Sequence, residues 1–245
     1  SGFAFTGMAG FIIMELAFKK LIRRHDAIKN ISIRDILNLS VPMFMTTAIN
    51  IIIAQTGVIM LGVFRTDAEI GYYSVAVKLA TLTSFILSAI NTISAPKFSE
   101  LYHSGKMDEL FYVARKSTKL IFYTTAPILF FLLIFGKLVI SILFGIEFKE
   151  AYIALLILVI GQFINSISGS IGYFMNMVGY HKQLRNILIT AAASNILLAL
   201  FLIPKIGING AALASMVCLI FWNVAALTYI YKKHGRTIIY IPFIN

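Results

Sequence analysis

Charged residues are scarce in this sequence: they make up 13% of its 245 residues, while hydrophobic residues make up 59%. Soluble domains average about 25% charged and about 45–50% apolar residues. The shortage of charge therefore excludes an ordinary soluble globule. Long apolar runs separated by short polar connectors predict an all-α, polytopic membrane protein instead.

Cysteine and acids within the apolar runs are almost absent as well. The single cysteine, Cys218, excludes an intrachain disulfide and a cluster of thiolate ligands. Of the ten carboxylates, only Glu15 falls inside an expected membrane span. The expected spans contain no Ser/His/Asp set, and the chain has no G-x-x-x-x-G-K-[ST] phosphate loop. We therefore expect no catalytic residue, no metal site and no cofactor, and a carrier is favoured over an enzyme.

Negative charge is the scarcer sign, with 10 acidic against 21 basic residues and a net charge of +11. The basic residues do not form one patch, which argues against a nucleic-acid partner, but fall in alternate connectors. Sixteen of the 21 lie in residues 19–38, 96–119, 179–186 and the C-terminal tail, and four lie in residues 64–71, 137–150 and 205–208. The positive-inside rule places the basic connectors and the C-terminus in the cytoplasm.

About seven stretches are long and apolar enough to cross a bilayer as helices. They are residues 3–18, 39–63, 72–95, 118–136, 151–178, 186–204 and 209–231. The chain opens inside an apolar run without an initiator methionine, so we expect a fragment. The expected domains are residues 1–18 as the last helix of a preceding lobe, 19–38 as a basic cytoplasmic linker, 39–231 as a six-helix lobe and 232–245 as a cytoplasmic tail. The linker is expected to contain a short interfacial helix, with an ordinary charged loop as the alternative.

Several expected spans have one polar face. Ser74, Lys78 and Thr81 share a side of the helix expected at 72–95, and a lysine inside a membrane span is costly and indicates a functional site. The other polar candidates are Asn50 in 39–63, and Gln162, Asn165 and Asn176 in 151–178. Each residue alone is typical of packing between helices. Polar faces on three helices together favour a shared hydrated cavity that binds substrate.

The chain resembles the polysaccharide (O-antigen type) flippases of the multidrug/oligosaccharidyl-lipid/polysaccharide exporter superfamily, from about Asp35 to Tyr231. The similar stretches are IGYYSVAVKLATL, ISAPKFSELYHSGKMDELFYVARKSTKL, LFGIEFKEAYIALLIL and, most specifically, FLIPKIGINGAALAS. The resemblance implies a carrier with two six-helix lobes, of which this chain supplies the C-terminal half. It also implies that Lys78 attracts an anionic headgroup.

Members of this family flip undecaprenyl-diphosphate-linked oligosaccharides across the cytoplasmic (inner) membrane of prokaryotes. The resemblance therefore implies a lipid-linked oligosaccharide, membrane lipids, the N-terminal lobe and polysaccharide assembly proteins as partners. A multidrug exporter of the same superfamily is one alternative, although it would more naturally carry a buried carboxylate. A polysaccharide-polymerase-type membrane enzyme is another, although the chain lacks the large outer loops such an enzyme needs. A purely structural membrane subunit is the third.

Overall fold

The structure of the protein is a computed structural model, which describes residues 33–240. The chain divides into two compact units, residues 1–41 and 42–245. In the first unit only the beginning of one helix is described, so the span expected at 3–18 and most of the expected linker lie outside the described residues. The fold and the site described below belong to the second unit.

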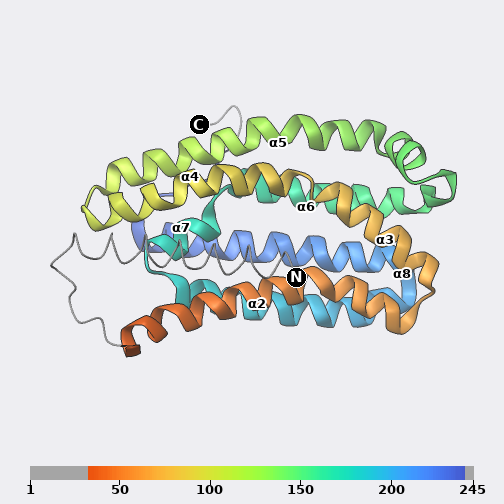
Figure 1. Ribbon diagram of the computed structural model, residues 1–245, viewed down its shortest axis with the longest axis horizontal. Coiled ribbons are helices and arrows are strands. Elements are labelled where there is room, and N and C mark those ends of the chain that lie inside the picture. The colour runs from red at the N-terminus through yellow and green to blue at the C-terminus, as the bar shows by residue number, and fades with distance from the viewer. Residues whose placement is uncertain (1–32, 241–245) are drawn as a thin grey trace, which may run out of the picture. The chain divides into compact units, whose positions relative to one another are not determined.

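The described chain is built from helices and contains no strand (Figure 1). They are α2 (Ile33–Phe64), α3 (Asp67–Ala80), α4 (Thr83–His103), α5 (Met107–Leu143), the 3-10 helix η1 (Ile146–Glu150), α6 (Ala151–Ser168), α7 (Ile171–Met177) and α8 (His181–His234). Local sequence explains where several begin or end. Asp67 and Glu69 occupy the first turn of α3, where negative charge is favourable. Gly105 has a positive φ of 70° in the turn between α4 and α5.

Four of these helices are long and apolar enough to span a membrane, namely α2, α5, α6 and α8, and α3 with α4 makes a fifth candidate bent by 42°. Large apolar side chains such as Phe131, Ile134 and Ile142 are exposed on α5. Exposed apolar side chains on this scale suit contact with lipid. The protein is an all-α, multi-pass membrane protein.

The helix α8 contains a break that makes it two segments. Ile206 and Gly207 leave the helical conformation, and Gly207 has a positive φ of 56°. The chain reverses there, so that the two halves of α8 run side by side in opposite directions (Figure 1). Arg65, which follows α2, donates from Nη2 to the carbonyl oxygens of Ile203 at 3.0 Å and Pro204 at 2.9 Å. Those carbonyls end the first half of α8 and need partners from outside it.

Each expected span from residue 39 onward corresponds to one or more helices, although the helix ends differ from those expected. Residues 39–63 lie in α2, which already begins at Ile33, and 118–136 is the middle of the longer α5. The span expected at 72–95 is broken between α3 and α4, and the one expected at 151–178 is broken between α6 and α7. The count of seven is therefore not confirmed. Pro96 lies inside α4, which continues past the expected end of the 72–95 span at residue 95.

Two apolar cores hold the helices together, one near each end of the bundle. The first contains Leu61, Tyr73, Leu155 and Ile203, near the reversal in α8. The second joins α4, α5, α7 and both outer ends of α8. Polar side chains can therefore gather between the two cores without disrupting either.

The chain after α8 folds back on the bundle. The backbone N–H of Tyr240 donates to the carbonyl of Ile167 at 3.2 Å, and Arg115 Nε donates to the carbonyl of Thr237 at 2.9 Å. The hydroxyls of Tyr123 and Tyr240 are 2.9 Å apart. This hydrogen bond raises the pKa of the Tyr240 phenol above its ordinary value. The segment therefore packs against α5 and α6.

Candidate functional site

A cavity of about 620 Å³ lies between α2, α3, α4, α6, α7 and α8. Its walls mix polar side chains with aromatic and aliphatic ones. The polar and aromatic lining residues are Thr46, Thr47, Asn50, Tyr73, Thr81, Ser84, Asn91, Gln162, Asn165, Tyr173, Asn176, Ser215 and Trp222. This volume and this mixture are typical of small-molecule sites, in which a few polar groups orient the ligand.

The structure brings together most of the residues singled out from the sequence. Asn50, Thr81, Gln162, Asn165 and Asn176 all line the cavity, and they come from α2, the α3–α4 break, α6 and α7. Residues more than a hundred positions apart therefore share one site.

Ser74 and Lys78 are not among the lining residues. Each follows a lining residue, Tyr73 or Val77, by one position, and one position turns a side chain about 100° around a helix. Their offset places them beside the cavity wall rather than on it.

Lys78 stands in the last turn of α3, eleven positions after Asp67, which corresponds to about 16 Å along the helix at 1.5 Å per residue. Its side chain is exposed, and within residues 33–240 it pairs with no carboxylate. A cation within a membrane span is stable only next to water or polar protein groups.

The break between α3 and α4 explains why the polar face changes along this segment. In an uninterrupted helix, Ser88 and Thr92 would lie on the same side as Ser74, Lys78 and Thr81, but both are exposed outside the cavity. Beyond the break, Ser84 and Asn91 line the cavity instead. Asn91 was missed because the sequence was read as a single uninterrupted helix.

A second break, at Gly169, shapes the opposite wall. Gly169 adopts φ 62° and ψ −130°, a conformation that side chains disfavour, and a Cβ there would collide with Oγ1 of Thr118. The chain then enters the short helix α7, which contributes Asn176 to the cavity. Only glycine fits this close approach to α5.

The amides of the cavity wall form a linked set. Asn165 Nδ2 donates to Gln162 Oε1 at 3.3 Å, and Asn223 Nδ2 donates to Asn165 Oδ1 at 3.2 Å. Asn223 is completely buried and also donates to the carbonyl of Leu219 at 2.9 Å. Asn223 therefore positions the two lining amides from behind. Across the cavity, the hydroxyls of Tyr73 and Ser215 are 2.9 Å apart.

Two lining amides keep unused hydrogen-bonding capacity. The Oδ1 atoms of Asn91 and Asn176 are buried and have no hydrogen-bond partner among the described residues. Unpaired buried acceptors are uncommon and need an explanation, such as a donor supplied by water or ligand. Both oxygens would accept a hydrogen bond from a hydroxyl group.

Comparison with known proteins shows the family of this chain. A family model described as polysaccharide biosynthesis protein matches residues 8–153, more than half of the chain. The chain belongs to this polysaccharide biosynthesis family. The match covers α2 to η1 among the described helices, and it includes lining residues such as Asn50 and Asn91.

Two curated proteins are similar to this chain. The uncharacterized membrane protein MJ1068 of Methanocaldococcus jannaschii is 25% identical over 209 residues, which cover 84% of this chain and 41% of that protein. The probable low-salt glycan biosynthesis flippase Agl15 of Haloferax volcanii is 25% identical over 158 residues, which cover 64% of this chain and 34% of that protein. The chain thus spans less than half the length of these relatives.

Proposed function

We propose that this chain is the C-terminal part of a flippase that moves lipid-linked oligosaccharides across a membrane for polysaccharide biosynthesis. The observation that carries the proposal is the cavity of about 620 Å³, lined by amides and hydroxyls, inside a bundle with an apolar exterior. Sugar hydroxyls both donate and accept hydrogen bonds, as Asn, Gln, Ser and Thr do. The unpaired oxygens of Asn91 and Asn176 suit hydroxyl donors in particular.

In this proposal the carrier lipid is undecaprenyl diphosphate, whose tail stays in the bilayer while the glycan crosses through the cavity. Lys78 stands beside the cavity wall and attracts the diphosphate as a point charge. The other substrate-binding residues are Ser74, Thr81, Asn50, Gln162, Asn165 and Asn176. A carrier of this kind needs no cofactor and catalyses no covalent step.

The remaining domain assignments belong to the same proposal. Residues 1–18 are the last helix of a preceding lobe. Residues 19–38 link that lobe to the lobe formed by residues 39–231. The basic connectors and the tail from residue 232 face the cytoplasm.

The rival exporter and enzyme functions fit the cavity less well. None of the described residues that line it is an aspartate or glutamate, whereas a buried carboxylate is the group that an ion-coupled multidrug exporter would more naturally use. Asn, Gln, Ser and Thr also offer no general acid or base for a polymerase. Hydrogen-bonding side chains without titratable acids favour a polar, uncharged cargo such as a glycan.

The test is a flipping assay with the complete protein in vesicles that contain a lipid-linked oligosaccharide. Thr81→Val should reduce the rate several-fold, because it removes a lining hydroxyl without changing the shape of the side chain. Thr228→Val is the matched control, since Thr228 is exposed outside the cavity and its hydroxyl also bonds a carbonyl of its own helix. Export of a cationic dye by the complete protein, with no flipping, would overturn the proposal in favour of the exporter.

A further inference from the structure

A second hollow lies on the outer side of the bundle, between α4 and α5, and shares no residue with the central cavity. We call it the α4–α5 groove; its volume is about 460 Å³. Its lining residues are Ile90, Ile93, Ser94, Val113, Lys116, Ser117, Lys119, Leu120 and Tyr123. The hydroxyls of Ser94 and Ser117 are hydrogen-bonded to each other at 2.8 Å. The rest of the lining consists of aliphatic side chains, the Tyr123 ring and two lysines.

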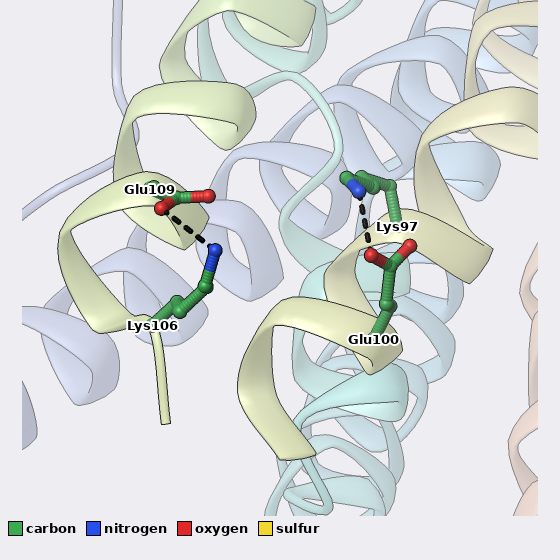
Figure 2. Close-up of polar contacts among 4 residues, drawn as sticks. All are labelled: Lys97, Glu100, Lys106 and Glu109. Carbon is green, nitrogen blue, oxygen red and sulfur yellow. Dashed lines mark hydrogen bonds and ion pairs between the residues drawn. The ribbon is translucent and has the colours of Figure 1, made fainter. Parts of the chain in front are cut away.

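The carboxylates of α4 and α5 near the turn that joins these helices have cationic partners among the described residues. Figure 2 shows Lys97 paired with Glu100 at 2.7 Å on α4, and Lys106 paired with Glu109 at 3.2 Å at the start of α5. The next carboxylate, Asp108, pairs with Arg236.

Lys116 and Lys119 are exposed and pair with no carboxylate in the described part of the chain. Aromatic rings hold them in place instead: Lys116 Nζ lies 5.9 Å from the ring centre of Tyr112, and Lys119 Nζ lies 5.9 Å from that of Tyr123 and 5.7 Å from that of Tyr240. The groove therefore carries two positive charges that no described carboxylate neutralises.

The position of the two lysines along α5 places the groove at the level of the lipid headgroups. Lys119 is the last charged residue of α5 before an apolar stretch that continues to Lys137. The 17 residues between them correspond to about 25 Å of helix, close to the thickness of a hydrocarbon core. The two lysines thus lie at the boundary between headgroups and acyl chains, where aromatic side chains also concentrate. Ile90, Ile93 and Leu120 line the apolar part of the groove.

We propose that the α4–α5 groove is a binding site for an anionic phospholipid of the surrounding membrane. The phosphate group pairs with Lys116 and Lys119, and one acyl chain lies along the isoleucines of α4. Charge complementarity selects this occupant, because a neutral lipid would fill the apolar part equally well but leave both ammonium groups unpaired. The site is independent of the transported substrate, since it lies outside the central cavity.

The test compares lipid binding to the full chain, purified in detergent, by native mass spectrometry. The probes are phosphatidylglycerol and phosphatidylcholine with identical acyl chains. The wild type should prefer phosphatidylglycerol. The double variant Lys116→Gln/Lys119→Gln should lose this preference by about 30-fold, because each lysine near an anionic lipid contributes about fivefold.

Two further variants separate the groove from general surface charge. The matched control Lys232→Gln/Lys233→Gln removes two exposed cations at the end of α8, outside the groove, and should keep the wild-type preference. Ile93→Trp fills the apolar part and should lower the binding of both lipids. An unchanged preference in the Lys116→Gln/Lys119→Gln variant would overturn the proposal. If both double variants lost the preference for phosphatidylglycerol equally, the proposal would be overturned as well, because the preference would then depend on net charge and not on the groove.

Discussion

Asn223 donates a hydrogen bond from its side-chain amide to the side-chain carbonyl of Asn165 at 3.2 Å, between the second half of α8 and the cavity wall on α6. Asn223 has no exposed surface, so it cannot touch a substrate itself. It restricts Asn165, which in turn donates to Gln162. The orientation of two lining amides thus depends on a residue behind them.

Replacing Asn223 by alanine should therefore weaken both folding and transport. The change leaves the side-chain carbonyl of Asn165 without its donor, and hydrogen bonds between membrane helices contribute about 1 kcal/mol. We expect the melting temperature of the purified protein to fall by a few degrees and flipping by the complete protein to fall several-fold. Thr228→Ala is the control and should change neither. Unchanged flipping in Asn223→Ala would mean that Asn165 needs no positioning.

Gly169→Ala tests the close approach between the α6–α7 break and α5. Gly207 provides a matched position, because its φ of 56° and ψ of −132° nearly repeat the φ of 62° and ψ of −130° at Gly169. A Cβ at Gly207 would meet the movable end of Glu69 at 2.8 Å, whereas one at Gly169 would meet the packed side chain of Thr118. Gly169→Ala should therefore lower the melting temperature more than Gly207→Ala. Equal decreases in melting temperature would mean that the strained backbone conformation, and not the contact with Thr118, causes the destabilisation.

The amphipathic pattern of the sequence predicted much of this site, since side chains one turn apart share a helix face. Asn50, Gln162 and Asn165 reach the cavity because α2 and α6 are regular where those residues lie. The pattern failed at the two breaks. Because the helix is interrupted after Ala80, Asn91 lines the cavity beyond the break. Whether a helix breaks at Gly169 depends on the contact with Thr118 across the bundle. Such contacts have no local signal in the sequence.

We expect that lysine cannot replace Arg65 in stabilising the reversal of α8. Its guanidinium donates from Nε and Nη2 to Ile203, and from Nη2 to Pro204. A lysine carries a single ammonium and cannot reproduce this fork. Arg65→Lys and Arg65→Gln should both destabilise the purified protein, by about 1–3 kcal/mol. Lys205→Gln, which changes an exposed cation next to the same turn, should have little effect. Full stability of Arg65→Lys would show that charge alone suffices.

The proposed orientation in the membrane can be tested with single cysteines in a Cys218→Ser background. Ser104 lies in the α4–α5 turn at the basic end, and Lys205 lies at the reversal of α8. In intact cells, a membrane-impermeant thiol reagent should label Lys205→Cys and spare Ser104→Cys. Both should react after the cells are permeabilised. Labelling of Ser104→Cys alone would invert the proposed topology.

Lys78 provides the sharpest test of the proposed mechanism. Lys78 stands in the last turn of α3, about 16 Å along the helix from Asp67, and its side chain is exposed. Its position beside the cavity wall suits attraction of a diphosphate. In the complete protein, Lys78→Ala and Lys78→Gln should reduce flipping at least tenfold at unchanged membrane abundance. Lys78→Arg should keep part of the activity, because arginine preserves the charge.

The control for Lys78 is Lys137→Gln, which neutralises an exposed lysine on α5 that does not line the central cavity. It should flip lipid-linked oligosaccharide at the wild-type rate, since loss of one positive charge elsewhere leaves the path of the diphosphate intact. A salt titration adds a second readout: attraction between Lys78 and a diphosphate weakens as ionic strength rises, so the wild type should lose activity with salt more steeply than Lys78→Gln. Wild-type flipping by Lys78→Gln at matched expression would remove Lys78 from the substrate path, and the diphosphate would then need another cationic partner.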